Sequence, residues 1–151
     1  MTDVSPTSAK LHGDLTLHGV TKTVTFSDFS AGENCFILEK NNIQPMVKIG
    51  NNVILWSANH IGHRTVIRDH AYLASNICIS GFCDIGERSW IGVGANFRDY
   101  CKVGADCFIT MGAQVTAREV PAGSVVTGTP ATVLGVDAQA ARKLRQTYFG
   151  L

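Results

Sequence analysis

Histidine is the residue type in this chain best suited to proton transfer near neutral pH, and three of its five histidines lie close together. They are His60, His63 and His70, in a polar segment that also contains Asn59 and Arg64. A histidine beside a bound hydroxyl or amine can take its proton as a general base. The segment therefore carries the candidate chemistry, provided that the fold exposes one of these imidazoles.

A period of six residues organises the chain around this segment. Every sixth position from residue 31 to residue 115 is apolar. The column consists of Ala31, Ile37, Ile43, Ile49, Leu55, Ile61, Ile67, Leu73, Ile79, Ile85, Ile91, Phe97, Val103, Ile109 and Val115. At a hydrophobic content of 45%, chance would produce this run in one chosen frame roughly once in 10^5 trials. The repeat is therefore a property of the fold.

Six residues are too few for a helical repeat, but they fit one flat side of a parallel β-helix, in which three hexads close a triangular coil. A second column, two positions earlier, is mostly small or β-branched and includes every cysteine except Cys78. Glycine often follows the apolar column, where a tight corner is needed. We predict an all-β, single-stranded parallel β-helix of about five coils over residues 29–135.

Composition narrows the function classes. The 151 residues carry a formal net charge of +1, which argues against a basic nucleic-acid platform. No apolar run reaches the roughly 18 residues of a membrane helix, so we expect no membrane insertion. Five cysteines, an odd number without a signal peptide, disfavour a secreted disulfide scaffold. These features favour a cytoplasmic location.

Three corner segments resemble the hexapeptide repeat of left-handed β-helix acyltransferases. They are Ile49-Gly50-Asn51-Asn52-Val53, Ile85-Gly86-Glu87-Arg88-Ser89 and Val103-Gly104-Ala105-Asp106-Cys107. The string from Trp56 to His70 is most similar to the NeuD/PglD-type sugar O- and N-acetyltransferases. The left hand of the coil is implied by this resemblance. So is coenzyme A near the loop Gly128-Thr129-Pro130-Ala131.

The resemblance also implies a site. His63 stands where the family has its catalytic general base. Coenzyme-contacting positions fall on Tyr72, Gly92, Val93, Met111 and Gly112, and the acceptor-binding candidates are Asn59, His60 and Arg64. For Asn59, a stacked structural asparagine at a coil corner is the alternative. Arg64 replaces the acidic residue that often orients the base, so Asp69 or a residue of another subunit would have to do so.

The function that follows is acetyl transfer from acetyl-CoA to an amino or hydroxyl group of a sugar, with a nucleotide-linked sugar as the expected acceptor. The acceptor attacks the thioester directly while His63 takes its proton, so no metal and no cysteine nucleophile are required. We expect a homotrimer, because the site is only half-built on one chain. The alternatives are a metal-dependent lyase of the γ-carbonic-anhydrase type, using His60, His63 and His70, and a non-catalytic scaffold.

The two ends of the chain differ from the coil. Residues 1–28 are expected to form an N-terminal cap or a partial first coil, with the first ten residues loose. The run from Gly13 to Lys22 is also similar to a strand pair of YceI-type lipid-binding barrels. Residues 136–151 are predicted to form a C-terminal helix, because they are rich in helix formers and begin with a plausible N-cap at Asp137.

Overall fold

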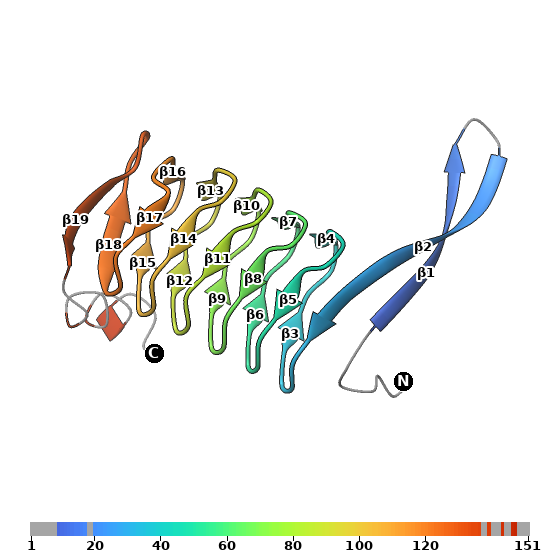
Figure 1. Cartoon of the computed structure of the whole chain (residues 1–151), viewed down its shortest axis with the longest axis horizontal. Helices are drawn as coiled ribbons and strands as arrows, with labels where there is room; N and C mark the ends of the chain where they lie inside the picture. The colour runs from blue at the N-terminus through green and yellow to red at the C-terminus, as the bar shows by residue number, and fades with distance from the viewer. Residues whose placement is uncertain (1–8, 18–19, 137–138, 140–142, 144–145, 148–151) are drawn as a thin grey trace.

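The chain winds into a triangular coil of about five turns, built from three sheets that form its flat sides (Figure 1). The sheets are parallel within the coil, and two of them end in an antiparallel strand pair. The structure is a computed structural model and describes residues 9–17 and 20–136, together with 139, 143, 146 and 147. The predicted all-β parallel β-helix is confirmed. Each sheet is named below after one of its features.

The strands of the chain belong to three sheets. The hairpin sheet contains β1 (Ala9–Leu17), β2 (Val20–Ala31), β5 (Lys48–Ile49), β8 (Val66–Ile67), β11 (Asp84–Ile85), β14 (Lys102–Val103) and β17 (Glu119–Val120). The Tyr72 sheet contains β3 (Phe36–Ile37), β6 (Ile54–Leu55), β9 (Tyr72–Leu73), β12 (Trp90–Ile91), β15 (Phe108–Ile109), β18 (Ser124–Thr127) and β19 (Thr132–Val136). The His60 sheet contains β4 (Asn42–Ile43), β7 (His60–Ile61), β10 (Cys78–Ile79), β13 (Asn96–Phe97) and β16 (Gln114–Val115).

The sixth-residue column forms the core. From β3 to β16, its members are the second residues of the two-residue strands, and from Ile49 onward all of them are buried. Successive coils pair in parallel with a step of eighteen residues, as Ile61 pairs with Ile79 and Ile79 with Phe97. The first residue of each strand points outward, because side chains alternate along a strand. The outward residues therefore decide what each flat side offers to a ligand.

Three corners join the sheets, and each is named after a residue on it. The His63 corner (residues 44–47, 62–65, 80–83 and 98–101) joins the His60 sheet to the hairpin sheet. The Arg88 corner (50–53, 68–71, 86–89 and 104–107) leads on to the Tyr72 sheet. The Met111 corner (38–41, 56–59, 74–77, 92–95 and 110–113) returns to the His60 sheet.

At Gly62 and Gly86, which are first residues of their corners, glycine is required by close approach of the next coil. A Cβ on Gly62 would lie 2.5 Å from the carbonyl carbon of Ser80, and one on Gly86 would lie 2.3 Å from that of Gly104. The left-handed backbone occurs two residues later, often at non-glycine residues such as Arg64, with φ of 59°, and Arg88, with φ of 56°. These two corners therefore need glycine first, and a positive φ follows two residues later.

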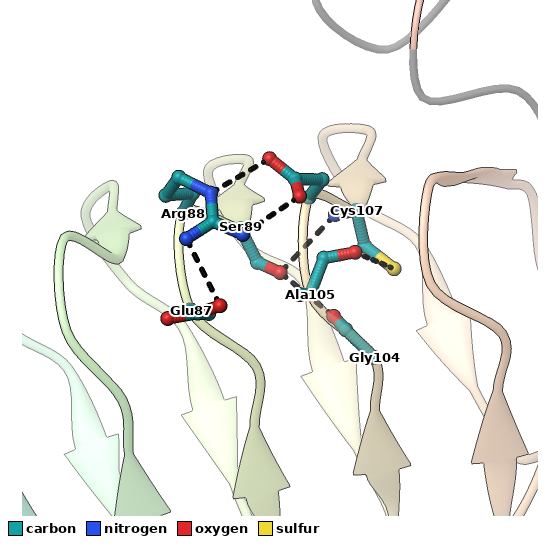
Figure 2. Close-up of polar contacts among 7 residues, drawn as sticks. Glu87, Arg88, Ser89, Gly104, Ala105 and Cys107 are labelled. Carbon is teal, nitrogen blue, oxygen red and sulfur yellow. Dashed lines mark hydrogen bonds and ion pairs between the residues drawn. The ribbon is translucent and has the colours of Figure 1, made fainter.

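Polar contacts between coils hold the Arg88 corner together, as Figure 2 shows. Arg88 donates two hydrogen bonds of 3.0 Å to the carboxylate of Asp106, one coil further on, and its guanidinium lies 2.9 Å from Glu87. On the inner side, Ser89 Oγ donates to the Gly104 carbonyl at 3.0 Å and accepts from the Cys107 N–H at 3.2 Å. Successive turns of this corner are thus linked by ion pairs on the outside and by the buried Ser89 hydroxyl on the inside.

Cysteines on the small column lie inside the coil, as that column predicts. Cys83, Cys101 and Cys107 are buried, and removal from water raises the pKa of each thiol, that of Cys101 to about 12. Such thiols stay protonated near neutral pH and behave as small hydrophobic side chains.

The ends depart from the coil. The strands β1 and β2 pair antiparallel, as in a hairpin, and the end of β2 pairs in parallel with β5. An antiparallel pair is not the geometry of a coil turn, so the hairpin stands in place of the partial coil considered for this region. The predicted C-terminal helix lies mostly outside the described residues; the four that are described there have helical backbone. No helix in the described part of the chain is long and apolar enough to cross a membrane.

Candidate functional site

His63 lies on the outside of the coil, one residue beyond the corner glycine Gly62. Its backbone N–H donates to Gln44 Oε1 at 2.9 Å, and its Nδ1 lies 3.2 Å from the same oxygen. The imidazole also meets the ring of Phe82 edge-on, with centroids 5.0 Å apart. His63 is therefore exposed, but its ring has defined neighbours on the coils before and after it.

The side chain of Arg64 lies over the ring of Phe82, the residue that also contacts His63. Its guanidinium carbon lies 5.7 Å from the centroid of Phe82, in a cation–π arrangement. Phe82 in turn stacks on Tyr100, with centroids 4.8 Å apart. The corner thus carries a cation and two aromatic rings beside the imidazole, in positions that could contact an acceptor.

Gln44 is a site residue that the sequence reasoning missed, and Asp69 does not fill the role considered for it. Asp69 lies at the next corner, where its Oδ1 accepts from the backbone N–H of Asn51 at 2.9 Å. The imidazole instead faces Gln44, nineteen residues before it and one coil away. The eighteen-residue stacking rule could have narrowed the search, since it places residue 45 beside residue 63.

Asn59 turns into the coil and away from any external ligand. It is only 1% exposed, its Nδ2 donates to the Trp56 carbonyl at 2.6 Å, and its Oδ1 accepts from the Ile77 N–H at 2.8 Å. Both polar atoms of the amide are thus bonded inside the coil. The structure places Asn59 as the stacked structural asparagine rather than as an acceptor contact.

His60 is the outward residue of β7 and is half-buried on the outer face of the His60 sheet. Along this face it pairs with Asn42 on one side and Cys78 on the other, and Asn96 and Gln114 continue the row. The outer face of this sheet is therefore a polar stripe. It runs between the His63 corner and the Met111 corner.

Three of the five predicted coenzyme-binding residues line one groove of about 470 Å³ on the Tyr72 sheet. Tyr72 forms its floor, stacked on Trp90 at 5.7 Å, while Trp90 stacks on Phe108 at 4.6 Å. Val93 and Met111 form a rim at the Met111 corner, and Met111 is 76% exposed. The groove is apolar and aromatic, a lining typical of sites for small organic ligands.

The two predicted glycines have different settings. Gly92 is buried beneath the rim, where a Cβ would lie 2.6 Å from the backbone nitrogen of Met111. Gly112 is exposed, has φ of 67°, and leaves open space around its Cα. Gly92 is thus fixed by coil packing, whereas Gly112 permits a close approach from outside.

One chain does not bring the base and the groove together. His63 and Met111 lie at opposite edges of the His60 sheet, and the groove opens on a different flat side of the triangle. A second groove, of about 940 Å³, follows the hairpin sheet and is lined by charges of both signs, including Lys48, Asp84 and Lys102. Arg68 is bound there to Asp84 through two bonds of 2.7 Å.

The three clustered histidines of the metal alternative also separate in space. His60 lies on a flat side, His63 at one corner, and His70 at the Arg88 corner, where its Nδ1 lies 3.0 Å from Asn52 Nδ2. Among the described residues, no group of three or more His, Cys, Asp or Glu side chains is placed to hold a metal ion.

Known structures resemble this coil over most of its length. The UDP-N-acetylglucosamine O-acyltransferase LpxA of Moraxella catarrhalis matches 79% of the chain and 50% of its own, with a TM-score of 0.60 and 21% identity. The acetyltransferase domain of PglB from Neisseria gonorrhoeae, solved with acetyl coenzyme A, matches 67% of the chain and 55% of its own, with a TM-score of 0.54 and 24% identity. The chain has the left-handed β-helix fold of these hexapeptide-repeat acyltransferases.

Sequence comparison also finds acyltransferases among the similar proteins. An acyl-[acyl-carrier-protein]–UDP-N-acetylglucosamine O-acyltransferase of Pseudomonas putida is 24% identical over 132 residues, which are 86% of this chain and 51% of that protein. The chain thus spans about half the length of the curated relatives it matches. No family model matches the sequence.

Proposed function

We propose that the protein transfers an acyl group, acetyl from acetyl-CoA in the first instance, to an amino or hydroxyl group of a nucleotide-linked sugar. The main observation behind the proposal is the exposed imidazole of His63, which lies at a coil corner in contact with Gln44 and Phe82. The names of the relatives support the substrate class, since they act on a UDP-linked sugar. The acetyl coenzyme A complex of the PglB domain supports the donor.

The chemistry needs one base and one donor of hydrogen bonds. The acceptor oxygen or nitrogen attacks the thioester carbonyl carbon, its proton passes to His63, and the carbon–sulfur bond breaks. His63 then returns the proton to the thiolate, so atoms and charge balance without a covalent enzyme intermediate. A backbone N–H near a corner would stabilise the oxyanion. Arg64 and His60 would contact the acceptor, and Tyr72, Val93 and Met111 the donor.

The complete site would be shared between copies of the chain. Because His63 and the apolar groove lie on different sides of one coil, we place the His63 corner of one copy against the groove of the next, in a homotrimer. The polar stripe through His60 would then line the acceptor side. Sedimentation of a trimer at micromolar concentration is expected; a monomer would contradict this arrangement.

The decisive experiment measures release of free thiol from acetyl-CoA with a panel of nucleotide-linked amino and deoxy sugars. We expect His63→Ala to lower turnover by about 10²- to 10⁴-fold while the protein stays folded. His70→Ala is the matched control, because it makes the same change at a different corner. Equal activity of the wild type and His63→Ala would reject the base assignment.

A mixing experiment tests the shared site. Met111→Glu puts a charge into the donor groove and should also inactivate the protein. If His63 and Met111 act across an interface, subunits of the two inactive variants, unfolded and refolded together, regain activity at about one quarter of the interfaces. If both residues served one chain, the mixture would stay inactive.

A further inference from the structure

At the second residue of three corner turns, the backbone N–H is capped by a side chain from the following coil. In each cap, a carboxylate or carboxamide oxygen accepts from a backbone N–H eighteen residues earlier, at 2.9 Å. The pairs are Asn51 to Glu33, Asp69 to Asn51, and Asp99 to Gly81. By this rule the N–H of His63 would be capped from residue 81, which is glycine and has no side chain.

Gln44 supplies the missing cap from the opposite direction. Its Oε1 accepts from the His63 N–H at 2.9 Å, and its own backbone N–H is fixed by the Ile61 carbonyl at 2.9 Å. Glycine at residue 81, in place of a capping residue, has a second effect. It leaves space beside the coil, and the His63 imidazole occupies that space. A Cβ on Gly81 would lie 2.7 Å from His63 Cε1 and 2.9 Å from its Nε2.

The backbone bond determines which atom of the Gln44 amide faces the imidazole. A backbone N–H can only donate, so the amide atom 2.9 Å from it must be the oxygen. The same oxygen lies 3.2 Å from His63 Nδ1, and this contact is favourable only when Nδ1 carries the proton. In the neutral ring Nε2 then has the free lone pair.

We propose that Gln44 is a positioning residue that fixes the Nδ1–H tautomer of His63. Gly81, which has no side chain, leaves the space that the His63 ring occupies. The inference rests on the proposed function for its catalytic meaning, because Nε2 becomes the atom that accepts the proton of the acceptor group. The neutral amide of Gln44 thus orients the ring, a role that an acidic residue at position 64 would otherwise have. Phe82 supports the ring from the side.

The first test needs neither a variant of Gln44 nor turnover. Nitrogen-15 NMR of the histidine-labelled wild type above the titration of the ring, with His63→Ala for assignment, should give a protonated Nδ1 and an unprotonated Nε2. The opposite tautomer would overturn the proposal. This result stands or falls independently of whether the protein is an acyltransferase.

The second test compares two substitutions of Gln44. Gln44→Met keeps the length but removes the acceptor, and we expect a mixed tautomer and a loss in kcat of about 10- to 100-fold, with little change in the KM for the donor. Gln44→Glu keeps the oxygen, so the tautomer is retained. Its negative charge favours the imidazolium, so the acidic limb of the pH–rate profile moves to higher pH.

Two further variants separate positioning from general damage. Gly81→Ala should displace the ring and lower kcat, while circular dichroism and thermal unfolding remain close to wild type, because the clash is with a movable side chain. Gln146→Met is the matched control, because it makes the same change at an exposed residue far along the chain, and it should change neither tautomer nor rate. An unchanged tautomer and kcat in Gln44→Met would refute the proposal. Failure of wild-type turnover alone would refute only the proposed function.

Discussion

Asn59→Ala is expected to destabilise the coil strongly while leaving turnover per folded site nearly unchanged. The carboxamide is buried, its Nδ2 donates to the Trp56 carbonyl, and its Oδ1 accepts from the Ile77 N–H. Truncation to alanine removes both partners at once. The Ile77 N–H lies in the buried interior, where water cannot replace its lost bond, whereas the bond to the Trp56 carbonyl is only partly buried.

The size of the effect follows from those two orphaned groups. A buried donor left without a partner costs about 1–3 kcal/mol, and loss of the partly buried bond adds about 1 kcal/mol, so the variant should lose about 2–4 kcal/mol of unfolding free energy. Domains of this size have only about 5–15 kcal/mol in total. The loss should therefore be plain in urea denaturation at a fixed protein concentration.

Asn41→Ala is the matched control, one coil earlier. Asn41 makes the same two kinds of bond, with its Nδ2 to the Leu38 carbonyl at 2.8 Å and its Oδ1 to the Asn59 N–H at 2.9 Å, but it is only half-buried. Water can replace these bonds, so we expect a loss of about 1 kcal/mol. Equal losses at the two sites would refute the reasoning. Lost turnover with stability intact would make Asn59 an acceptor contact after all.

Two other perturbations probe the interior and the corners. The pKa of the Cys101 thiol is raised by burial from 9.0 to about 12, so the unfolded chain ionises first and stability falls between pH 9 and pH 12, by up to about 4 kcal/mol. Cys101→Ala should flatten this part of the stability curve, and an unchanged slope would contradict the assignment. Gly62→Ala should cost about 1–3 kcal/mol, because its Cβ would meet the backbone of Ser80, whereas Ser80→Ala, at the same position one coil on, should be nearly neutral in thermal unfolding. Equal effects of those two substitutions would show that the corner tolerates a Cβ.

The coil could be predicted because one physical requirement recurs at every turn. Each two-residue strand must bury one side chain, so the period of six appears fifteen times and a single weak member, such as Ala31, does not obscure it. The same logic placed the cysteines inside. It also placed His63 outside, since a residue just past the corner glycine cannot point into a filled core.

The N-terminal hairpin and the partner of His63 were not accessible to that logic. Within each strand of the hairpin, apolar residues stand at even spacings, Leu15 and Leu17 in β1 and Val20 and Val24 in β2, and this pattern competes with the chance spacing of six between His12 and His18. Gln44 reaches diagonally from one coil to the next, so its contact depends on side-chain geometry rather than on a column. Besides the eighteen-residue spacing, its sequence signal is the glycine at residue 81, where a capping residue is expected.

Side chains at the N-terminal end of the coil are less buried than those further along, and the candidate site lies near that end. On the Tyr72 sheet, Phe36 and Ile37 of β3 are 57% and 36% exposed, whereas Leu55, one coil later, is fully buried. In a stack whose turns contact only their neighbours, the outermost turn opens at the lowest free energy. Gln44 belongs to that turn and His63 to the next. Opening of this single turn therefore also removes the support of the His63 imidazole. We expect heating to disturb the position of the base before it unfolds the coil.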